Sequence, residues 1–391
     1  MNEQVFDLPD ALKEGERLVI IGVGGGGGNA LDHIIASNVE GVEFIAANTD
    51  VKALRNNKAQ RKIILGEKLT RGLGAGADPQ KGMDAAKESI ELIRESLEGA
   101  DMIFVTAGMG GGTGTGAAPV IAEVACETGA LVVGVVTTPF GFEGVHRAEV
   151  AQQGLEQLRD RVDALLIVEN ERLLTQADDN IRMVDAYKMA NEVLRQAVQG
   201  VTDLIVKSGH INLDFADIRT VMKKSGSAIM GMGIADGDNA AEAAAKIAIR
   251  APLMSHTIDG ATNAIVNVEG SEDMTLREIK KAADLVNTMT DGRVQTILGH
   301  VINNEMGDQV RVTVIATGLS DSAMHKKDSG GNAPINNTIR QGGRRGLLSN
   351  GRGPITLDGS DTMSGEEDIF RGMPKTTYDT PAIFRKKQQY N

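Results

Sequence analysis

Aromatic residues and cysteine are scarce in this chain of 391 residues. Phe, Trp and Tyr together make up 3% of it and Trp is absent, so its core must be aliphatic. Cys126 is the only cysteine, which excludes an intramolecular disulfide and a four-cysteine metal site. The first 16 residues lack the basic-then-apolar order of a secretion signal, and no apolar run reaches the roughly 18 residues of a membrane-spanning helix. We therefore expect a soluble, cytoplasmic protein.

Basic residues are outnumbered by acidic ones. Lys and Arg number 41 against 53 Asp and Glu, which gives a formal net charge of −12. A general nucleic-acid binder would carry a basic face, so we expect no nucleic-acid partner.

Glycine, in contrast, is abundant, with 47 residues against a usual share of about 7%. Much of the excess falls in three clusters, near residues 22–28, 72–76 and 108–116. Because glycine lets the backbone approach a bound molecule closely, these clusters predict ligand-binding loops.

Short apolar runs alternate with helical patterns from residue 17 onward, which is typical of a parallel sheet with crossover helices. We expect a doubly wound α/β domain, one long helix with an apolar stripe, and a smaller α+β domain with a four-stranded sheet. These three parts cover residues 17–180, 181–206 and 207–318, after a flexible N-terminus over 1–16. The expected strands are 17–23, 42–47, 62–65, 102–107, 131–137, 164–168, 227–234, 264–268, 294–302 and 309–316, and the expected helices include 29–37, 84–97, 239–250 and 275–288.

The first glycine cluster, GVGGGGGNA at Gly22–Ala30, stands between an expected strand and an expected helix. Backbone N–H groups and the helix dipole hold an anion at such a position. Gly22, Gly24 and Gly27 also satisfy GxGxxG, so a dinucleotide-binding unit remains an alternative, with Asp50 as its ribose carboxylate. A purely structural glycine turn is a third interpretation.

The cluster GMGGGTGTG at Gly108–Gly116 follows another strand and opens a helix expected near Ala117. It offers a second set of backbone amides at a second helix N-terminus, which a dinucleotide-binding oxidoreductase does not need. The chain lacks the GK[ST] ending of a P-loop, so no lysine neutralises the phosphates. Backbone amides, the Thr113 and Thr115 hydroxyls and Mg²⁺ would have to share that charge.

The run GGGTGTG at Gly110–Gly116 resembles the phosphate loop of the tubulin/FtsZ family, and GLGAGADP at Gly72–Pro79 also resembles that family. The linker and the chain end bring the sequence closer to the FtsZ branch, the bacterial tubulin-like cell-division GTPases, than to tubulin. The resemblance implies a tubulin-like fold, GTP or GDP with Mg²⁺ as ligands, GTP hydrolysis and head-to-tail homopolymers. It further implies a cytokinetic ring scaffold at midcell, on the inner face of the membrane.

Several side chains acquire expected roles only through this resemblance. Glu143, in PFGFEGVHR, would bind the sugar hydroxyls, and Arg147 would lie near the sugar and base. Asn170 and Asn191 would contact the sugar or the guanine edge, although ENER at 169–172 departs from the family's usual Pro-Asn-Asp-Lys-like run. Tyr187 would stack on the base, or would simply belong to the apolar stripe of its helix. The full nucleotide-binding set is Gly24, Gly25, Gly26, Gly27, Gly28, Asn29, Gly110, Gly111, Gly112, Thr113, Gly114, Thr115, Gly116, Glu143, Arg147, Asn170, Tyr187 and Asn191, and no metal-ligating residue is predicted.

The motif NLDFAD at Asn212–Asp217 places two carboxylates three residues apart at the start of a helix. Such residues are often only helix caps. In the family, however, this loop enters the nucleotide site of the next subunit. The resemblance therefore implies that Asp214 and Asp217 polarise the attacking water and that Asn212 orients it. Each chain would then hold half of an active site at each end.

After the second domain the sequence turns to Gly, Ser, Asn, Asp and Arg, which predicts a disordered linker over 319–377. The last segment, 378–391, begins with YDTPAIFRKK at Tyr378–Lys387, which resembles the tail peptide that binds membrane tethers and regulators of the FtsA or ZipA kind. The alternative is an unstructured end. The positive charge of the segment Tyr378–Lys387 is too small for firm direct membrane binding.

Two other functions remain as alternatives. The GVGGGGG run also fits a nicotinamide-dependent oxidoreductase. A nucleotide-binding scaffold that assembles without hydrolysis is the second, and the presence of Asp214 and Asp217 argues against it.

Overall fold

A computed structural model describes residues 15–175, 180–207, 211, 214–251, 258, 260–289 and 294–319. All of these residues belong to one structural unit. The expected linker, apart from its first residue Leu319, and the docking peptide lie outside the described residues, as does nearly all of the N-terminal segment over 1–16, so those expectations stay predictions. Leu319 is buried in a hydrophobic cluster. Within the described ranges, every helix is too short or too polar to span a bilayer.

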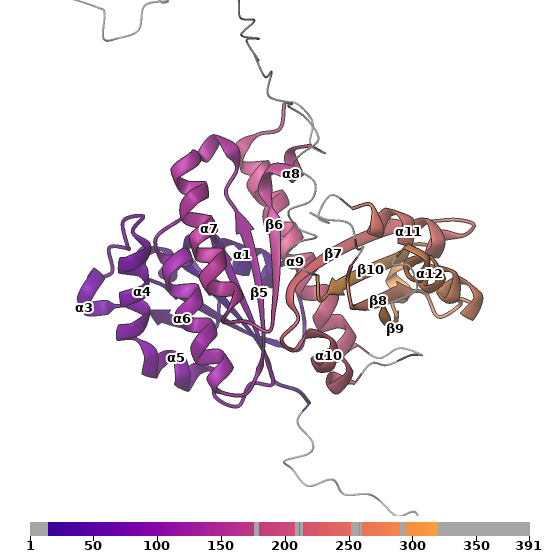
Figure 1. Cartoon of the computed structure of the whole chain (residues 1–391), viewed down its shortest axis with the longest axis horizontal. Coiled ribbons are helices and arrows are strands. Elements are labelled where there is room, and N and C mark those ends of the chain that lie inside the picture. The colour runs from indigo at the N-terminus through magenta and orange to yellow at the C-terminus, as the bar shows by residue number, and fades with distance from the viewer. Residues whose placement is uncertain are drawn as a thin grey trace, which may run out of the picture. The chain divides into compact units, whose positions relative to one another are not determined.

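A single sheet of ten strands runs through the described part of the chain, in the order β3-β2-β1-β4-β5-β6-β7-β10-β8-β9. Figure 1 labels the strands from β5 to β10. The strands from β3 to β7 are parallel, β10 is antiparallel to both β7 and β8, and β9 is parallel to β8. The strand bounds are β1 Leu18–Val23, β2 Val42–Asn48, β3 Arg61–Ile64, β4 Met102–Gly108, β5 Leu131–Thr138, β6 Ala164–Glu169, β7 Gly226–Ala235, β8 Asn263–Gly270, β9 Gln295–Ile302 and β10 Val310–Thr317.

The four strands expected in the second domain are present as β7, β10, β8 and β9, but they do not form a sheet of their own. They continue the first sheet, because β7 pairs with β6 over the register Ala164↔Gly226 to Leu166↔Ala228. The exact domain boundaries stay a prediction.

Helices cover both faces of the parallel part of the sheet, which confirms the doubly wound α/β architecture. Successive residues of β1 point to opposite faces, with Leu18 and Ile20 in one core and Val19 and Ile21 in the other. Because both faces are covered, the strand is buried throughout, as is usual for parallel sheets. The helix bounds are α1 Gly24–Ala36, α2 Val51–Asn56, α3 Glu67–Thr70, α4 Pro79–Glu88, α5 Ile90–Leu97, α6 Thr113–Glu127, α7 Val145–Arg159, α8 Asn170–Leu174, α9 Met183–Val206, α10 Phe215–Met222, α11 Ala240–Ile249 and α12 Leu276–Met289, with short 3₁₀ turns η2 Gly141–Glu143 and η3 Asn304–Met306.

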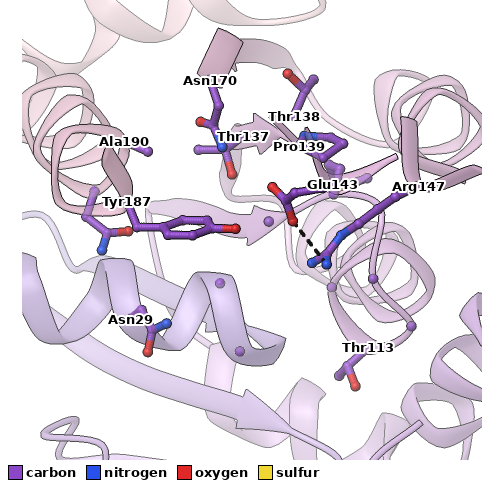
Figure 2. A pocket seen from close by; sticks show the side chains of 18 residues that line it. Asn29, Thr113, Thr137, Thr138, Pro139, Glu143, Arg147, Asn170, Tyr187 and Ala190 are labelled. Carbon is purple, nitrogen blue, oxygen red and sulfur yellow. Dashed lines mark ion pairs between the residues drawn. The ribbon is translucent and has the colours of Figure 1, made fainter. Parts of the chain in front are cut away.

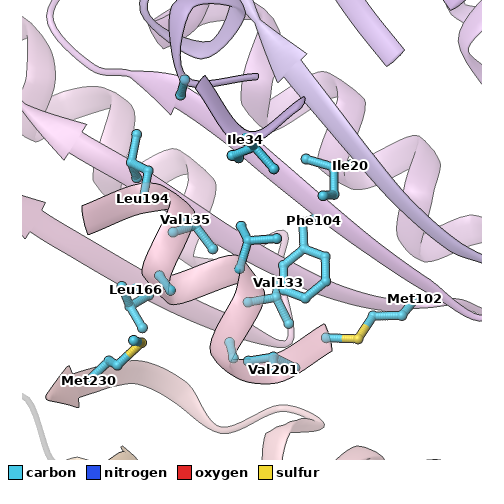
Figure 3. Packing of buried hydrophobic residues seen from close by; sticks show 14 of the residues in the cluster. Ile20, Ile34, Met102, Phe104, Val133, Val135, Leu166, Leu194, Val201 and Met230 are labelled. Carbon is cyan, nitrogen blue, oxygen red and sulfur yellow. The ribbon is translucent and has the colours of Figure 1, made fainter. Parts of the chain in front are cut away.

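The long helix expected from the apolar stripe is α9, with 24 residues. Its Leu194 and Val201 side chains pack in the same core as Val133 and Val135 of β5, as Figure 3 shows. Met183, an apolar residue at the first turn of the helix, is 61% exposed. The N-terminal end of α9 therefore extends beyond the core, toward the pocket described below.

Three expected helix boundaries were wrong. Helices α1 and α6 begin at Gly24 and Thr113, whereas the sequence favoured starts near Asn29 and Ala117. Glycine costs about 1 kcal/mol in a helix, but close packing on the neighbouring strand selects it here: a Cβ added at Gly27 would lie 2.3 Å from the Thr106 carbonyl oxygen.

The third error concerns the helix expected over 84–97, which begins earlier, at Pro79, and is divided into α4 and α5 at Ser89. The Ser89 hydroxyl donates to the Ile64 carbonyl at 3.2 Å and accepts from Gly66 N at 3.0 Å. Serine hydroxyls that bond to backbone groups compete with helix formation, which explains the break. The other expected elements lie within two residues of the observed bounds.

Candidate nucleotide-binding site

A pocket of about 370 Å³ lies at the carboxyl ends of the parallel strands (Figure 2). This volume is within the range of roughly 300–1,000 Å³ that is usual for small-molecule sites, and in open α/β sheets ligands bind at this edge. The described residues that line it are Gly25, Gly26, Asn29, Gly108, Met109, Gly111, Gly112, Thr113, Gly114, Thr137, Thr138, Pro139, Glu143, Arg147, Asn170, Tyr187, Ala190 and Asn191.

Helices α1 and α6 both begin at this pocket. Neither the Val23 cap of α1 nor the Gly112 cap of α6 supplies a side-chain hydrogen bond, and neither helix has an acid in its first turn. The first backbone N–H groups of any helix have no intrahelical acceptor. Because no side chain caps or neutralises these two helix ends, their N–H groups and positive dipole ends are available to a ligand. The two helix ends together form an anion-binding site.

Gly25 and Gly111 show where a ligand would lie. A Cβ added at either residue meets no protein atom within 4 Å, and neither residue has a positive φ. Neither backbone conformation nor protein packing requires glycine there, although both residues line the pocket. A molecule that lies directly against the backbone explains both glycines, so the residues fit a nucleotide phosphate chain.

Other glycines of the two clusters do not line the pocket, and the packing or conformation of the chain requires glycine at their positions. A Cβ at Gly24 would lie 2.8 Å from Gly114 N, and a Cβ at Gly116 would lie 1.9 Å from the Pro79 carbonyl oxygen. Gly110 has a φ of 96°, a conformation that favours glycine. Of the sequence-predicted set, Gly24, Gly27, Gly28, Gly110, Thr115 and Gly116 are absent from the described lining residues.

The two threonines of the second cluster differ in placement. The Thr113 side chain lies on the pocket wall. The Thr115 side chain is buried, and its hydroxyl accepts a hydrogen bond from Gly110 N at 2.8 Å. Thr115 therefore holds the loop, whereas Thr113 faces the pocket.

Glu143 and Arg147 lie side by side at the pocket edge. The Glu143 Oε1 atom accepts from Phe140 N at 3.0 Å, and Oε2 lies 3.0 Å from Arg147 Nη1 (Figure 2). Burial raises the pKa of the Tyr187 phenol, and the charge of Glu143 and a hydrogen bond to it add to the rise. Tyr187 thus stays protonated and donates to Glu143.

The ring of Tyr187 contacts Phe140 edge to face, with centroids 5.2 Å apart and an interplanar angle of 87°. This geometry leaves the tyrosine as part of the wall, half-buried, with Ala190 and Asn191 on the same side of α9. Tyr187 therefore belongs to α9 and also lines the pocket, and its stacking on a base stays a prediction.

Asn170 is 4% exposed, and its Oδ1 atom has no hydrogen-bond partner in the described part of the chain. An unpaired buried acceptor costs about 1–3 kcal/mol. Because Asn170 lines the pocket, an N–H donor on a bound ligand would pair with it. Although the run ENER at 169–172 departs from the family pattern, Asn170 still lines the pocket.

Sequence reasoning missed Glu171, the next residue. Its Oε2 atom accepts a hydrogen bond from Gly141 N at 2.7 Å, which ties the 3₁₀ turn carrying Glu143 to helix α8. No sequence signal pairs two residues thirty positions apart. The strand-end residues Thr137 and Thr138, also missed, could have been found from their place at the carboxyl end of β5.

Glu171→Ala removes the hydrogen bond from Gly141 N, which holds the turn that carries Glu143. A hydrogen bond to a charged group contributes about 1.5–3 kcal/mol. We expect part of this free energy to be lost from nucleotide binding, which weakens affinity about tenfold. Glu171→Gln keeps an acceptor and should bind nearly as the parent chain does. Titration with a fluorescent guanine nucleotide measures both. Equal affinities for all three proteins would contradict this role.

The acidic residues of the third motif lie elsewhere. Asp214 and Asp217 are exposed, and neither lines the pocket of its own chain. The Asp214 carboxylate caps α10 by accepting from Asp217 N at 2.8 Å. Asn212 lies outside the described residues.

A parallel α/β sheet with two uncapped, glycine-rich helix ends at one pocket defines a nucleotide-binding protein. A family model described as the Tubulin/FtsZ family GTPase domain matches residues 17–178, and one described as the FtsZ family C-terminal domain matches residues 226–320. The structure is similar to an empty dimer of FtsZ from M. jannaschii, with 42% identity, coverage of 79% of this chain and 90% of that chain, and a TM-score of 0.75. It also shares its fold with CetZ2 from Haloferax volcanii, solved as a GTPγS-bound protofilament, at 22% identity, 78% and 94% coverage and a TM-score of 0.68.

The chain therefore belongs to the FtsZ family of tubulin-like GTPases. Its first domain is a GTPase domain, which binds GTP or GDP and hydrolyses GTP.

Proposed function

We propose that this protein assembles head to tail in the presence of GTP and hydrolyses GTP at the contact between subunits. The observation that carries the proposal is the lack of a free acid at the nucleotide. Among the described residues that line the pocket, Glu143 is the one acid, and it is paired with Arg147 at 3.0 Å. Phosphoryl transfer to water needs a group that positions the water. The exposed carboxylates of Asp214 and Asp217 can supply it from a second copy.

Apolar side chains beside the pocket support a protein contact there. Phe142 and Val145, which flank Glu143, are 59% and 76% exposed, and Met183 and Val184 at the start of α9 are 61% and 64% exposed. Exposed apolar groups gathered at one site mark interaction surfaces. A contact between this surface and the different surface around Asp217 is heterologous, so it builds open filaments unless it closes into a ring.

Within the pocket, the proposed arrangement follows the chemistry of the walls. The amides near Gly25, Gly26 and the 111–114 loop would hold the phosphates, as helix N-termini do. Glu143 and Arg147 would bind the sugar, since a carboxylate has about four lone-pair sites and Phe140 N, Arg147 and Tyr187 use three of those of Glu143. Tyr187 would pack on the base, with Asn29, Asn170 and Asn191 at its polar edge.

Mg²⁺ is proposed as the accompanying ion. In the described part of the chain, no group of three acidic, histidine or cysteine side chains could hold a metal. Mg²⁺ usually keeps several waters and binds substrate phosphates, and Thr113 on the pocket wall would be its protein ligand. When bound, the ion would neutralise phosphate charge, while the protein amides orient the phosphate chain.

The cellular role that we propose is the cytokinetic ring scaffold of a bacterium, on the cytoplasmic face of the membrane at midcell. The tail at 378–387 would dock on membrane-tethering and regulatory division proteins, FtsA- or ZipA-like, without inserting into the membrane itself. Family membership supports the division role. A pull-down of the tether with a chain truncated before Tyr378 tests the docking.

The specific GTPase activity is expected to rise with protein concentration, because neighbouring copies would complete each pocket. Phosphate release and right-angle light scattering, recorded together after adding GTP and Mg²⁺, measure this. A specific activity that stays constant from high dilution to concentrations that scatter light would reject the shared site.

A nicotinamide-dependent oxidoreductase is disfavoured by the position of Asp50. Its carboxylate caps α2 by accepting from Lys52 N at 2.8 Å and Ala53 N at 3.2 Å, and Asp50 is absent from the described lining residues. Thermal protection by NAD but not by GTP would restore that alternative.

A further inference from the structure

Thr49, the residue directly after β2, connects two segments beside the pocket. The residue is fully buried, and its hydroxyl oxygen lies 2.6 Å from the hydroxyl oxygen of Thr113, the first residue of α6. Its carbonyl oxygen accepts from Gly74 N at 3.1 Å and from the Thr70 hydroxyl at 3.3 Å. The side chain thus holds α6, and the backbone holds the segment 70–78.

The same two segments touch directly at the start of α6. A Cβ added at Gly112 would lie 2.8 Å from Asp78 N and 2.9 Å from the Ala75 Cβ. Gly112 and Thr113 both line the pocket. The position of segment 70–78 and the position of the first amides of α6 are therefore coupled, and Thr49 bonds to both.

The hydroxyl pair can also adapt to the charge of the ligand. Either oxygen can be the donor. Thr49 can donate to Thr113, which leaves the Thr113 hydrogen free for a phosphate oxygen. It can also accept from Thr113, which leaves the Thr113 lone pairs free for a cation. In both cases the buried partner fixes where the Thr113 oxygen lies.

We propose that Thr49 is a positioning residue for the phosphate end of the nucleotide. The inference rests on the proposed placement of the phosphates at the first amides of α6. Thr49 is absent from the described lining residues, so it acts through Thr113 and through segment 70–78. Removal of the Thr49 hydroxyl should lower the affinity for a ligand more as the ligand carries more phosphates. It should leave the binding of the base and sugar unchanged.

The test compares Thr49→Val with the parent chain by titration with guanosine, GMP, GDP and GTP. We expect affinities for GDP and GTP to fall about tenfold and the affinity for guanosine to stay unchanged. Thr49→Ser keeps the hydroxyl and should restore the parent values. Thr106→Val is the matched control: Thr106 is also fully buried, and its hydroxyl has no partner in the described part of the chain, so its loss should change no affinity.

An equal loss for guanosine and GTP would show a purely structural role and overturn the inference, as would no loss at all. If Thr49→Val does not fold, Thr49→Ala is read in the same way, since it removes the same hydroxyl without adding volume. Failure of the parent chain to bind GDP would instead reject the proposed placement of the nucleotide. The two failures are therefore distinguishable.

Discussion

Asp217→Ala is expected to bind GTP as the parent chain does and to hydrolyse it about 10²–10⁴-fold more slowly, the usual effect of losing a group that handles the attacking water. Binding should survive because Asp217 is exposed on α10 and is not among the described residues of the pocket. Assembly should also survive, because the nucleotide and the apolar surface beside it remain. Phosphate release per unit of scattered light measures hydrolysis at constant polymer mass, and nucleotide titration measures binding.

Two variants separate chemistry from folding in this experiment. Asp214 caps α10, so Asp214→Ala would also cost about 1 kcal/mol of helix stability, whereas Asp214→Asn keeps a good cap and removes only the charge. Glu95→Ala removes an exposed acid of α5 and should leave turnover unchanged. Parent-like turnover in Asp217→Ala would remove this residue from the mechanism, whatever Asp214 does.

Hydrophobic periodicity was enough to predict most of the sheet. Strands β1, β4 and β5 are short, mostly aliphatic runs, and the helices on both faces of the sheet bury them except at the last residue of β4 and of β5. Local propensity failed where tertiary contacts outweigh it. The first glycine cluster predicts a loop, but close packing of Gly26 and Gly27 against β4 draws it into the first turns of α1.

The site could be predicted as far as its residues are contiguous in sequence. The composition of the glycine clusters predicts a phosphate site, because backbone amides at helix N-termini hold anions. The sugar-binding role expected of Glu143 rests only on the family resemblance. Glu171 and Thr49 could not be found in this way. Each acts through hydrogen bonds to residues more than twenty positions distant, contacts that exist only after the sheet has formed.

Gly111→Ala is expected to lower the affinity for GDP and GTP about 100-fold while leaving the melting temperature unchanged or slightly higher. A Cβ at this position meets no protein atom within 4 Å, and its φ is not positive, so the folded chain accepts alanine. The methyl group would instead enter the space proposed for the phosphates. Overpacking of a close contact costs about 1–3 kcal/mol, and the upper end corresponds to about 100-fold. Nucleotide titration and thermal melting measure the two effects.

Two glycines serve as controls with opposite expectations. Gly15 is equally free around its added Cβ but stands before β1, so Gly15→Ala should change neither affinity nor stability. Gly116 lies in α6, where a Cβ would come within 1.9 Å of the Pro79 carbonyl oxygen, so Gly116→Ala should lower the melting temperature first and affinity only as a consequence. Parent-like affinity in a folded Gly111→Ala protein would show that no phosphate lies against this loop. The pocket would then hold its nucleotide in some other orientation, and the proposed meeting of phosphates with the acids of a second copy would have to be abandoned.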